Sequence, residues 1–190
     1  MNVAFLDTET TGLDPRRHEV WEFCAIIRDP EQGREGDTTH LFQIAVDLDT
    51  ADDVALTIGR YQERAEPYPI GQTEAAWSIH TILKDCVIVG ANPTFDVGFL
   101  TALLQRHGLD LPWHYRPICV EAVAYGFMQG FAQAQFGAVI TDFALPWSAT
   151  DLIGPFVDRE NYPKHTALGD AEWVRDAWDA VHTIAEHVRI

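Results

Sequence analysis

The sequence contains little cysteine and no long apolar segment. Its three cysteines, Cys24, Cys86 and Cys119, are an odd number, and none belongs to a C-x-x-C pair. This pattern argues against structural disulfides and against a thiolate zinc site. No stretch approaches the roughly 18 uncharged apolar residues of a transmembrane helix, and the chain starts without the basic residues of a signal peptide. We therefore expect a protein of a reducing cytoplasm that makes no contact with a membrane.

Basic residues are also scarce. Lys and Arg number 13 against 29 Asp and Glu, so the formal net charge is −16. Proteins that hold a long nucleic acid do so with Lys and Arg, which displace counterions from the phosphates. The composition therefore argues against an extended phosphate-binding surface.

The sequence does contain enough apolar material for a folded core. Hydrophobic residues make up 47% of the 190 residues and charged residues 22%, which excludes wholesale disorder and fits a single domain. Strands are predicted over residues 3–6, 19–27, 39–46, 86–90 and 118–120. Helices are predicted over residues 52–65, 73–84, 94–107, 120–128 and 167–188, whereas residues 129–146 follow no clear pattern. This order predicts an α/β fold with a mixed sheet, antiparallel at one edge and parallel in the middle.

Two acidic residues follow the first predicted strand. Val3–Leu6 is a continuous apolar run, typical of a strand buried on both faces, and Asp7 and Glu9 come next. If the strand continues, both carboxylates project from the same face, at the end of a central strand where open α/β sheets bind ligands. If the strand stops at Leu6, they are solvated loop acids beside a turn.

Asp96 and Asp170 each head the apolar stripe of a predicted helix. Asp96 shares its helical face with Phe99, Leu100 and Leu103, and Asp170 shares its own with Trp173, Val174, Ala177 and Val181. Both carboxylates are therefore directed toward the packed side of a helix. Taken alone, each also fits an acid that interacts with the positive end of a helix.

The four acids together favour a metal site. Burying a carboxylate costs several kcal/mol unless a cation or hydrogen bonds compensate. Oxygen ligands without a thiolate favour Mg²⁺ or Mn²⁺ over Zn²⁺, and four acids can hold two such ions about 3.5–4 Å apart. We expect His165 on the loop that enters the last helix, with Thr166 as its N-cap, where the imidazole could act as general base on a metal-bound water. Without the acids, His165 would be interpreted as an ordinary surface residue.

Three motifs resemble those of a known nuclease family. They are Asp7-Thr8-Glu9-Thr10-Thr11-Gly12-Leu13, Asn92-Pro93-Thr94-Phe95-Asp96 and His165-Thr166-Ala167-Leu168-Gly169-Asp170-Ala171. In order and rough separation they resemble the three motifs of the DnaQ-like (DEDDh) 3′-to-5′ exonucleases, over almost the whole chain. The resemblance implies an RNase H-like three-layer fold with a central mixed β-sheet flanked by helices, and a single exonuclease domain over residues 1–190.

The resemblance also implies an activity and roles for individual residues. The activity is hydrolysis of phosphodiester bonds at the 3′ end of single-stranded DNA or RNA, with release of nucleoside 5′-monophosphates. Two divalent cations would serve as cofactors, Mg²⁺ with Mn²⁺ as a substitute. Asp7 would bridge both ions, Glu9 and Asp170 would complete one site, and Asp96 would serve the other. His165 would deprotonate the attacking water.

Three further residues are implied to bind substrate. The main chain around Thr10 would meet the terminal 3′-hydroxyl, Leu13 would pack against the last base, and Asn92 belongs to the second motif. Judged without the resemblance, Leu13 is equally well a turn residue on the surface. Many relatives carry His before the motif Asn, where this chain has Ala91. The H-G-I segment of many relatives has only a loose counterpart in Thr57-Ile58-Gly59.

Two alternatives to the exonuclease stay open. One is a nucleic-acid-binding or polymerase-associated module without catalysis, and the other is a phosphodiesterase restricted to dinucleotides. Nothing in the sequence supports a polymerase partner, and the oligomeric state is open. Because two divalent cations would neutralise four of the acids, the net charge of −16 leaves about −12. We therefore expect a protein that grips a few terminal nucleotides and has no long phosphate track.

Overall fold

The computed structural model of the protein describes residues 1–137, 140 and 148–187. Its centre is a five-stranded sheet with the strand order β3-β2-β1-β4-β5. The strands are β1 (Asn2–Thr10), β2 (Val20–Arg28), β3 (Thr38–Gln43), β4 (Cys86–Gly90) and β5 (Ile118–Cys119). Strand β2 runs antiparallel to β1 and β3, whereas β4 runs parallel to β1 and β5. The predicted mixed sheet with one antiparallel edge is confirmed.

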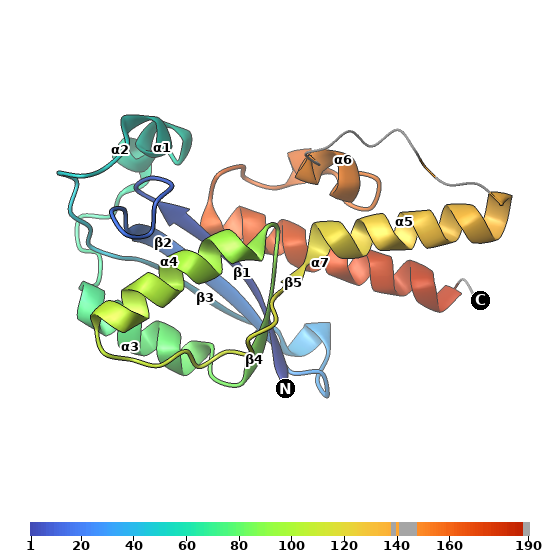
Figure 1. Ribbon diagram of the computed structural model, residues 1–190, viewed down its shortest axis with the longest axis horizontal. Helices are drawn as coiled ribbons and strands as arrows, with labels where there is room; N and C mark the ends of the chain where they lie inside the picture. Colours follow the sequence, from blue (N-terminus) through green and yellow to red (C-terminus); the bar gives the residue numbers. More distant parts are fainter. Residues whose placement is uncertain (138–139, 141–147, 188–190) are drawn as a thin grey trace.

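Helices lie on both sides of this sheet (Figure 1). The helices of the described residues are α1 (Asp53–Ile58), α2 (Tyr61–Arg64), α3 (Gln72–Ile82), α4 (Pro93–Arg106), α5 (Val120–Phe136), α6 (Ala149–Ile153) and α7 (Ala167–His187), with short 3₁₀ turns η1 (Arg34–Gly36) and η2 (Arg159–Asn161). In this part of the chain, no helix has both the length and the apolar character needed to cross a membrane.

Two of the predicted helices differ from the observed ones. The single helix predicted over residues 52–65 is wrong, because Arg60 has a left-handed φ of 52° and separates α1 from α2. The helix predicted to end near Met128 continues to Phe136 and ends at Gly137, whose φ of 63° is typical of a helix C-terminus. Of the residues left without a prediction, 138–139 and 141–146 lie outside the described residues.

Two apolar layers enclose the sheet. On one side, Leu6 of β1 packs in a cluster with Ile79 of α3 and Leu100 of α4. On the other side, Phe5 of β1 packs in a cluster with Val174 of α7. Because successive side chains of a strand point to opposite faces, β1 is buried on both sides, which explains its continuous apolar run.

Strand β1 continues through the first acidic motif. Its antiparallel partner β2 pairs with it from Val3 to Thr10, whereas β4 pairs only with Asn2–Phe5. The alternative in which the strand stops at Leu6 is therefore wrong. Asp7 and Glu9 project from the same face as Phe5, which is the face that α7 covers.

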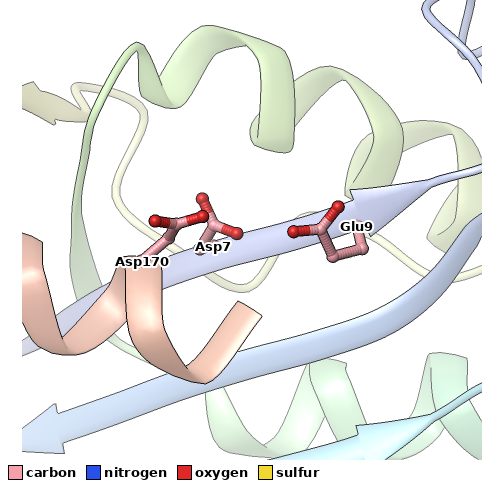
Figure 2. Close-up of side chains that lie close together, drawn as sticks. All are labelled: Asp7, Glu9 and Asp170. Atoms are coloured by element: carbon pink, nitrogen blue, oxygen red, sulfur yellow. The ribbon is translucent and has the colours of Figure 1, made fainter. Parts of the chain in front are cut away.

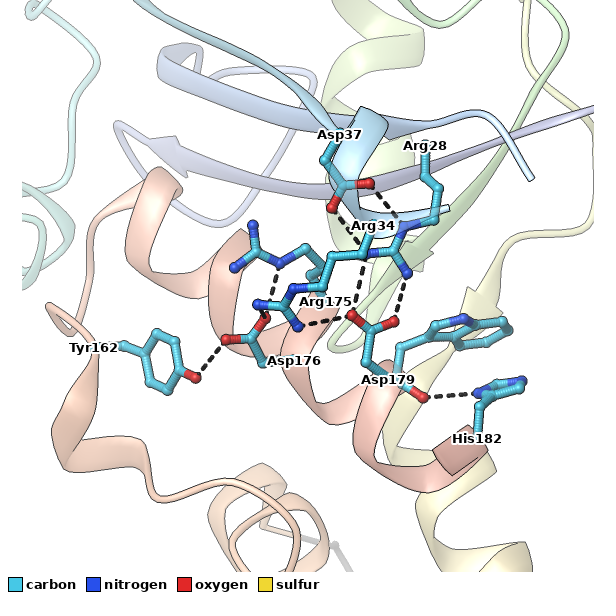
Figure 3. Close-up of polar contacts among 9 residues, drawn as sticks. Arg28, Arg34, Asp37, Tyr162, Arg175, Asp176, Asp179 and His182 are labelled. Atoms are coloured by element: carbon cyan, nitrogen blue, oxygen red, sulfur yellow. Dashed lines mark hydrogen bonds and ion pairs between the residues drawn. The ribbon is translucent and has the colours of Figure 1, made fainter. Parts of the chain in front are cut away.

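An ion-pair network joins the far end of β2 to α7 (Figure 3). Arg28, the last residue of β2, pairs with Asp37 at 2.7 Å and also with Asp179 of α7. Arg34 of η1 pairs with Asp176 and Asp179 of α7, each at 2.8 Å. These contacts join the end of β2 and the η1 turn to the middle of α7.

Candidate active site

Three carboxylates from two distant parts of the chain converge near the end of β1 (Figure 2). Asp7 and Glu9 come from alternate positions of β1, and Asp170 comes from the first turn of α7. Each residue offers one oxygen, and these oxygens all lie within 4.8 Å of one another. The packing of α7 on this face of the sheet therefore assembles a group of acids that lie 163 positions apart in the chain.

Asp96 reaches the same region from the first turn of α4. Its carboxylate accepts hydrogen bonds from the Thr8 backbone N–H at 2.9 Å and from the Thr8 hydroxyl at 2.7 Å. Thr8 lies beyond the last β1 residue that pairs with β4, so Asp96 takes the place of a strand partner. Asp96 is outside the three-residue group, but its charge acts on Asp7. We refer to Asp7, Glu9, Asp96 and Asp170 as the acid cluster.

The environment of the acid cluster raises the pKa of all four carboxyls. The pKa of Asp7 lies well above its usual value because of desolvation and then the charges of Asp96 and Asp170. Desolvation and the charge of Asp170 raise the pKa of Glu9 to about 8. Desolvation raises the pKa of Asp96 to about 7, although the hydrogen bonds from Thr8 oppose it, and raises the pKa of Asp170 against the charge of Arg159. Raised pKa values in four neighbouring carboxyls mean that the protein provides too little positive charge to stabilise their ionised forms. A bound divalent cation would supply that charge.

His165 lies on the loop before α7, as predicted. Helix α7 begins at Ala167, and the Thr166 hydroxyl oxygen accepts a hydrogen bond from the Gly169 N–H at 3.0 Å, so Thr166 is the N-cap. A Cβ at Gly169 would lie 2.1 Å from the Pro163 carbonyl oxygen, so this turn requires glycine. His165 is exposed, and its backbone donates a hydrogen bond to the Asp170 carboxylate, which opposes the rise in the pKa of Asp170 caused by desolvation. The loop therefore brings His165 beside the acid cluster.

The segment Thr57-Ile58-Gly59 also adjoins the acid cluster. A Cβ at Gly59 would lie 3.2 Å from Oε2 of Glu9 and 3.2 Å from Cζ2 of Trp21. A larger residue here would press on the Glu9 carboxylate. The loose counterpart of the H-G-I segment is thus placed against a cluster residue.

The three predicted substrate-binding residues surround the end of β1 in different ways. Thr10 is buried, and its hydroxyl donates to the Gly12 carbonyl at 2.7 Å. Asn92 precedes α4 with a left-handed φ of 51°, and its side-chain oxygen accepts from the Thr94 hydroxyl at 2.9 Å. Leu13 is 76% exposed. The Thr10 and Asn92 side chains are thus engaged within the protein, whereas the Leu13 side chain is open to a ligand.

Sequence reasoning did not identify three charged residues at the site. Glu22 stands directly opposite Glu9 in the β1–β2 pairing and is buried, where it pairs with Arg64. Arg159 pairs with Asp170, and its guanidinium lies 4.8 Å from the centre of the Trp173 ring. Glu22 carried a signal, because an acid inside an apolar strand is unusual. Arg64 and Arg159 carried no such signal, since the sequence does not distinguish an arginine exposed on the surface from one that pairs with a buried acid.

The donor set fits hard divalent cations. It consists of carboxylate oxygens. The positive charge of Arg159 offsets their negative charge only in part, since the pKa of Asp7 and the pKa of Asp170 stay raised although Arg159 opposes the rise. Mg²⁺ and Mn²⁺ prefer oxygen ligands of this kind. The arrangement is suited to reactions at a phosphodiester, where such ions offset charge on the oxygens of the reacting phosphate.

The chain belongs to the RNase T exonuclease family, whose model matches residues 4–174. This match confirms the resemblance of the three motifs to those of the DnaQ-like exonucleases. Among curated proteins, the chain is 28% identical to the oligoribonuclease of Vibrio cholerae serotype O1 over 131 residues. The matched region covers 64% of this chain and 72% of the oligoribonuclease.

Solved structures of exonuclease I show the same fold. E. coli exonuclease I in complex with a dT13 oligonucleotide matches 98% of this chain with a TM-score of 0.69 and 18% identity. Exonuclease I from Methylocaldum szegediense matches 98% of this chain with a TM-score of 0.68 and 19% identity. This chain spans 43% and 41% of those two chains. The expected RNase H-like fold is confirmed.

Proposed function

We propose that this chain is a metal-dependent 3′-to-5′ exonuclease that hydrolyses phosphodiester bonds at the 3′ end of single-stranded DNA or RNA and releases nucleoside 5′-monophosphates. The observation that carries the proposal is the convergence of the Asp7, Glu9 and Asp170 carboxylates within 4.8 Å in a chain of the exonuclease family. The oligonucleotide bound to E. coli exonuclease I supports a single-stranded substrate. We propose residues 1–190 as one exonuclease domain.

The acid cluster would hold two divalent cations, Mg²⁺ or Mn²⁺. Asp7, Glu9 and Asp170 provide converging oxygens, and Asp96 adds a fourth carboxylate whose charge acts on Asp7. When bound, the ions would lower the pKa of the attacking water and offset the charge on the leaving 3′ oxygen. The raised pKa of Glu9, about 8, supports the proposal, because the cluster lacks the positive charge that would keep it ionised at neutral pH.

His165 is the general base of the proposed reaction. Its side chain is exposed on the loop before α7, and its backbone bonds to the Asp170 carboxylate. A neutral imidazole can accept the proton of the attacking water near neutral pH. The main chain at Thr10, the exposed Leu13 side chain and Asn92 would contact the terminal nucleotide.

A second candidate function is hydrolysis restricted to very short oligoribonucleotides, dinucleotides included. It rests on the 28% identity to an oligoribonuclease over 131 residues. It is also compatible with the net charge of −16, since a short substrate needs few phosphate contacts. The chemistry would be the same, and the accepted length of substrate would differ.

The test is incubation of 5′-labelled DNA and RNA oligonucleotides, from dinucleotides to about 20 nucleotides, with Mg²⁺, with Mn²⁺ and with a chelator. The proposal expects a ladder that shortens from the 3′ end, requires metal and is absent with Asp7→Asn. Hydrolysis of dinucleotides but not of 20-mers would select the second candidate. Binding without products under every condition would favour a non-catalytic binding module.

A further inference from the structure

The loop that carries His165 is tied to a remote part of the chain by one arginine. Arg64, the last residue of α2, donates from Nη1 to the His165 carbonyl oxygen at 2.7 Å and to the Gly59 carbonyl oxygen at 2.8 Å. Arg64 and His165 lie 101 positions apart in the sequence. The Arg64 side chain is only 17% exposed, and its guanidinium lies 4.9 Å from the centre of the buried Trp21 ring. Arg64 is therefore held in one place by packing as well as by hydrogen bonds.

Glu22 ties the same loop down from β2. Its carboxylate pairs with Nη2 of Arg64, and the same oxygen accepts a hydrogen bond from the Ala167 N–H at 2.9 Å. This N–H is the first of α7 and has no partner within its own helix. Arg64 and Glu22 thus bind the loop on both sides of Thr166, one at the carbonyl of His165 and the other at the N–H of Ala167. We call this pair the Arg64–Glu22 clamp.

The conformation of His165 requires such support. Its φ of 56° lies in the left-handed region, which residues other than glycine adopt only uncommonly and at a cost in strain. A strained residue persists only where its surroundings impose the strain. The contacts of the Arg64–Glu22 clamp lie at the His165 carbonyl and one residue beyond Thr166, so they act on the backbone that sets the direction of the imidazole.

We propose that Arg64 and Glu22 are positioning residues that hold His165 for its role as general base. This inference rests on the proposed function, in which His165 accepts the proton of the attacking water. Neither clamp residue belongs to the acid cluster. The charges of Arg64 and Glu22 act on Glu9 in opposite directions, so removing both together leaves the balance of charge at the acid cluster unchanged. Loss of the clamp then acts on the reaction through the loop, where it lowers kcat and leaves metal binding and substrate affinity in place.

The principal test variant is Arg64→Met with Glu22→Gln. Removing Arg64 alone would leave the Glu22 carboxylate, 7% exposed, without its partner, which is strongly destabilising. The double variant removes one positive and one negative charge, so the net charge around the acid cluster does not change. Arg64→Lys is the second variant. It keeps the charge pair but has one nitrogen in place of the guanidinium fork, so it cannot serve Glu22, Gly59 and His165 together.

A matched control lies at the other end of the sheet. Arg28 and Asp37 also form a buried ion pair, with side chains 11% and 9% exposed. Arg28 also pairs with Asp179 of α7, which keeps its own ion pair with Arg34 when Arg28 is replaced. Arg28→Met with Asp37→Asn therefore removes a comparable pair and controls for a general loss of stability. Each variant is assayed for kcat and KM on a labelled oligonucleotide, for Mn²⁺ affinity by calorimetry and for thermal unfolding.

The decisive measurement is a cycle with His165→Ala. We expect the Arg64→Met, Glu22→Gln variant to lose about 10–100-fold in kcat, since misplacement of a base by about 1 Å costs roughly this much. KM and the Mn²⁺ dissociation constant should stay within about threefold, and the control should keep wild-type kcat. Adding His165→Ala to the clamp variant should give no lower kcat than His165→Ala alone, because the two changes remove the same contribution.

The results separate this inference from the function on which it rests. A clamp variant with wild-type kcat, or losses that multiply with that of His165→Ala, would overturn the inference while leaving the exonuclease intact. A loss of Mn²⁺ affinity equal to the loss of kcat would also overturn it, because the clamp would then support the acid cluster. A wild-type rate for His165→Ala would overturn the general base itself, and the inference with it.

Discussion

Binding of a divalent metal to the acid cluster should release protons, and lowering the pH should therefore weaken it. A carboxyl whose folded-state pKa is raised keeps its proton until the pH passes that raised value. Metal coordination requires the ionised form, so each protonated carboxyl must lose its proton when the ion binds. The pKa is raised to about 8 for Glu9 and about 7 for Asp96, and it is raised well above the usual value for Asp7.

The size of the effect follows from these values. At pH 7, a carboxyl of pKa about 8 is about 90% protonated and one of pKa about 7 is half protonated, so Glu9 and Asp96 together hold about 1.4 protons. At pH 6 the same two carboxyls hold about 1.9 protons. The Mn²⁺ dissociation constant should therefore rise roughly 50-fold from pH 7 to pH 6. Asp7 adds to this in the same direction.

The assay is titration calorimetry with Mn²⁺ at pH 7 in two buffers of different ionisation enthalpy. The difference in observed heat gives the number of protons released. Glu9→Gln should release about one proton fewer than the wild type. Asp37→Asn, in the remote ion pair with Arg28, should release as many as the wild type. Release of fewer than about 0.3 protons, or equal Mn²⁺ affinity at pH 6 and pH 7, would refute the reasoning.

The same pKa values predict how stability depends on pH without metal. Because the folded-state pKa of Glu9 lies above its unfolded value of 4.5, the folded state favours the protonated form. The contribution of Glu9 to the free energy of unfolding should therefore be greatest below about pH 4.5. It should fall by up to roughly 5 kcal/mol as the pH rises toward 8. Added Mn²⁺ should raise the unfolding temperature more at pH 8 than at pH 6, which thermal scans at the two pH values can check.

Three substitutions extend the reasoning. Asp7→Asn should abolish metal-dependent hydrolysis and raise the unfolding temperature of the metal-free protein, because it removes a repelled charge; undiminished hydrolysis would contradict the site assignment. His165→Ala should lower kcat roughly 10²–10⁴-fold with unchanged Mn²⁺ affinity, and a wild-type rate at neutral pH would remove His165 from the mechanism. Arg159→Gln should tighten Mn²⁺ binding about threefold or more, because the Arg159 guanidinium pairs with the Asp170 carboxylate and so competes with the ions for it. Weaker binding in calorimetry would instead show that Arg159 holds Asp170 in place.

Local patterns in the sequence predicted most of the elements that carry the site. The stripes below Asp96 and Asp170 placed these acids on two helices, as observed, and the apolar run before Asp7 identified the strand that carries it. Such patterns report which face of an element is buried, since burial follows the period of the strand or helix. The break at Arg60 was missed, because a left-handed residue inside an apparently helical pattern leaves no trace in hydrophobic spacing.

Other features depended on contacts between distant residues. Whether β1 ended at Leu6 or ran on to Thr10 was decided by its pairing with β2, which a single strand cannot reveal. The ion pairs of Glu22 with Arg64 and of Asp170 with Arg159 join residues that no local pattern connects. Sequence spacing carries information about neighbours on one element, whereas these partners meet only after the sheet and α7 have packed.

By itself, the sequence determined the fold class, the acids and the order of the three motifs, because these depend on residue type and on periods of two and 3.6 residues. Only the tertiary structure decided that the oxygens of Asp7, Glu9 and Asp170 meet within 4.8 Å, and that Arg64 holds the carbonyl of His165. The raised pKa of Glu9 likewise arises from desolvation and from a neighbour on another element. Distances and desolvation are properties of the packed chain, and they convert four acids in a sequence into one site.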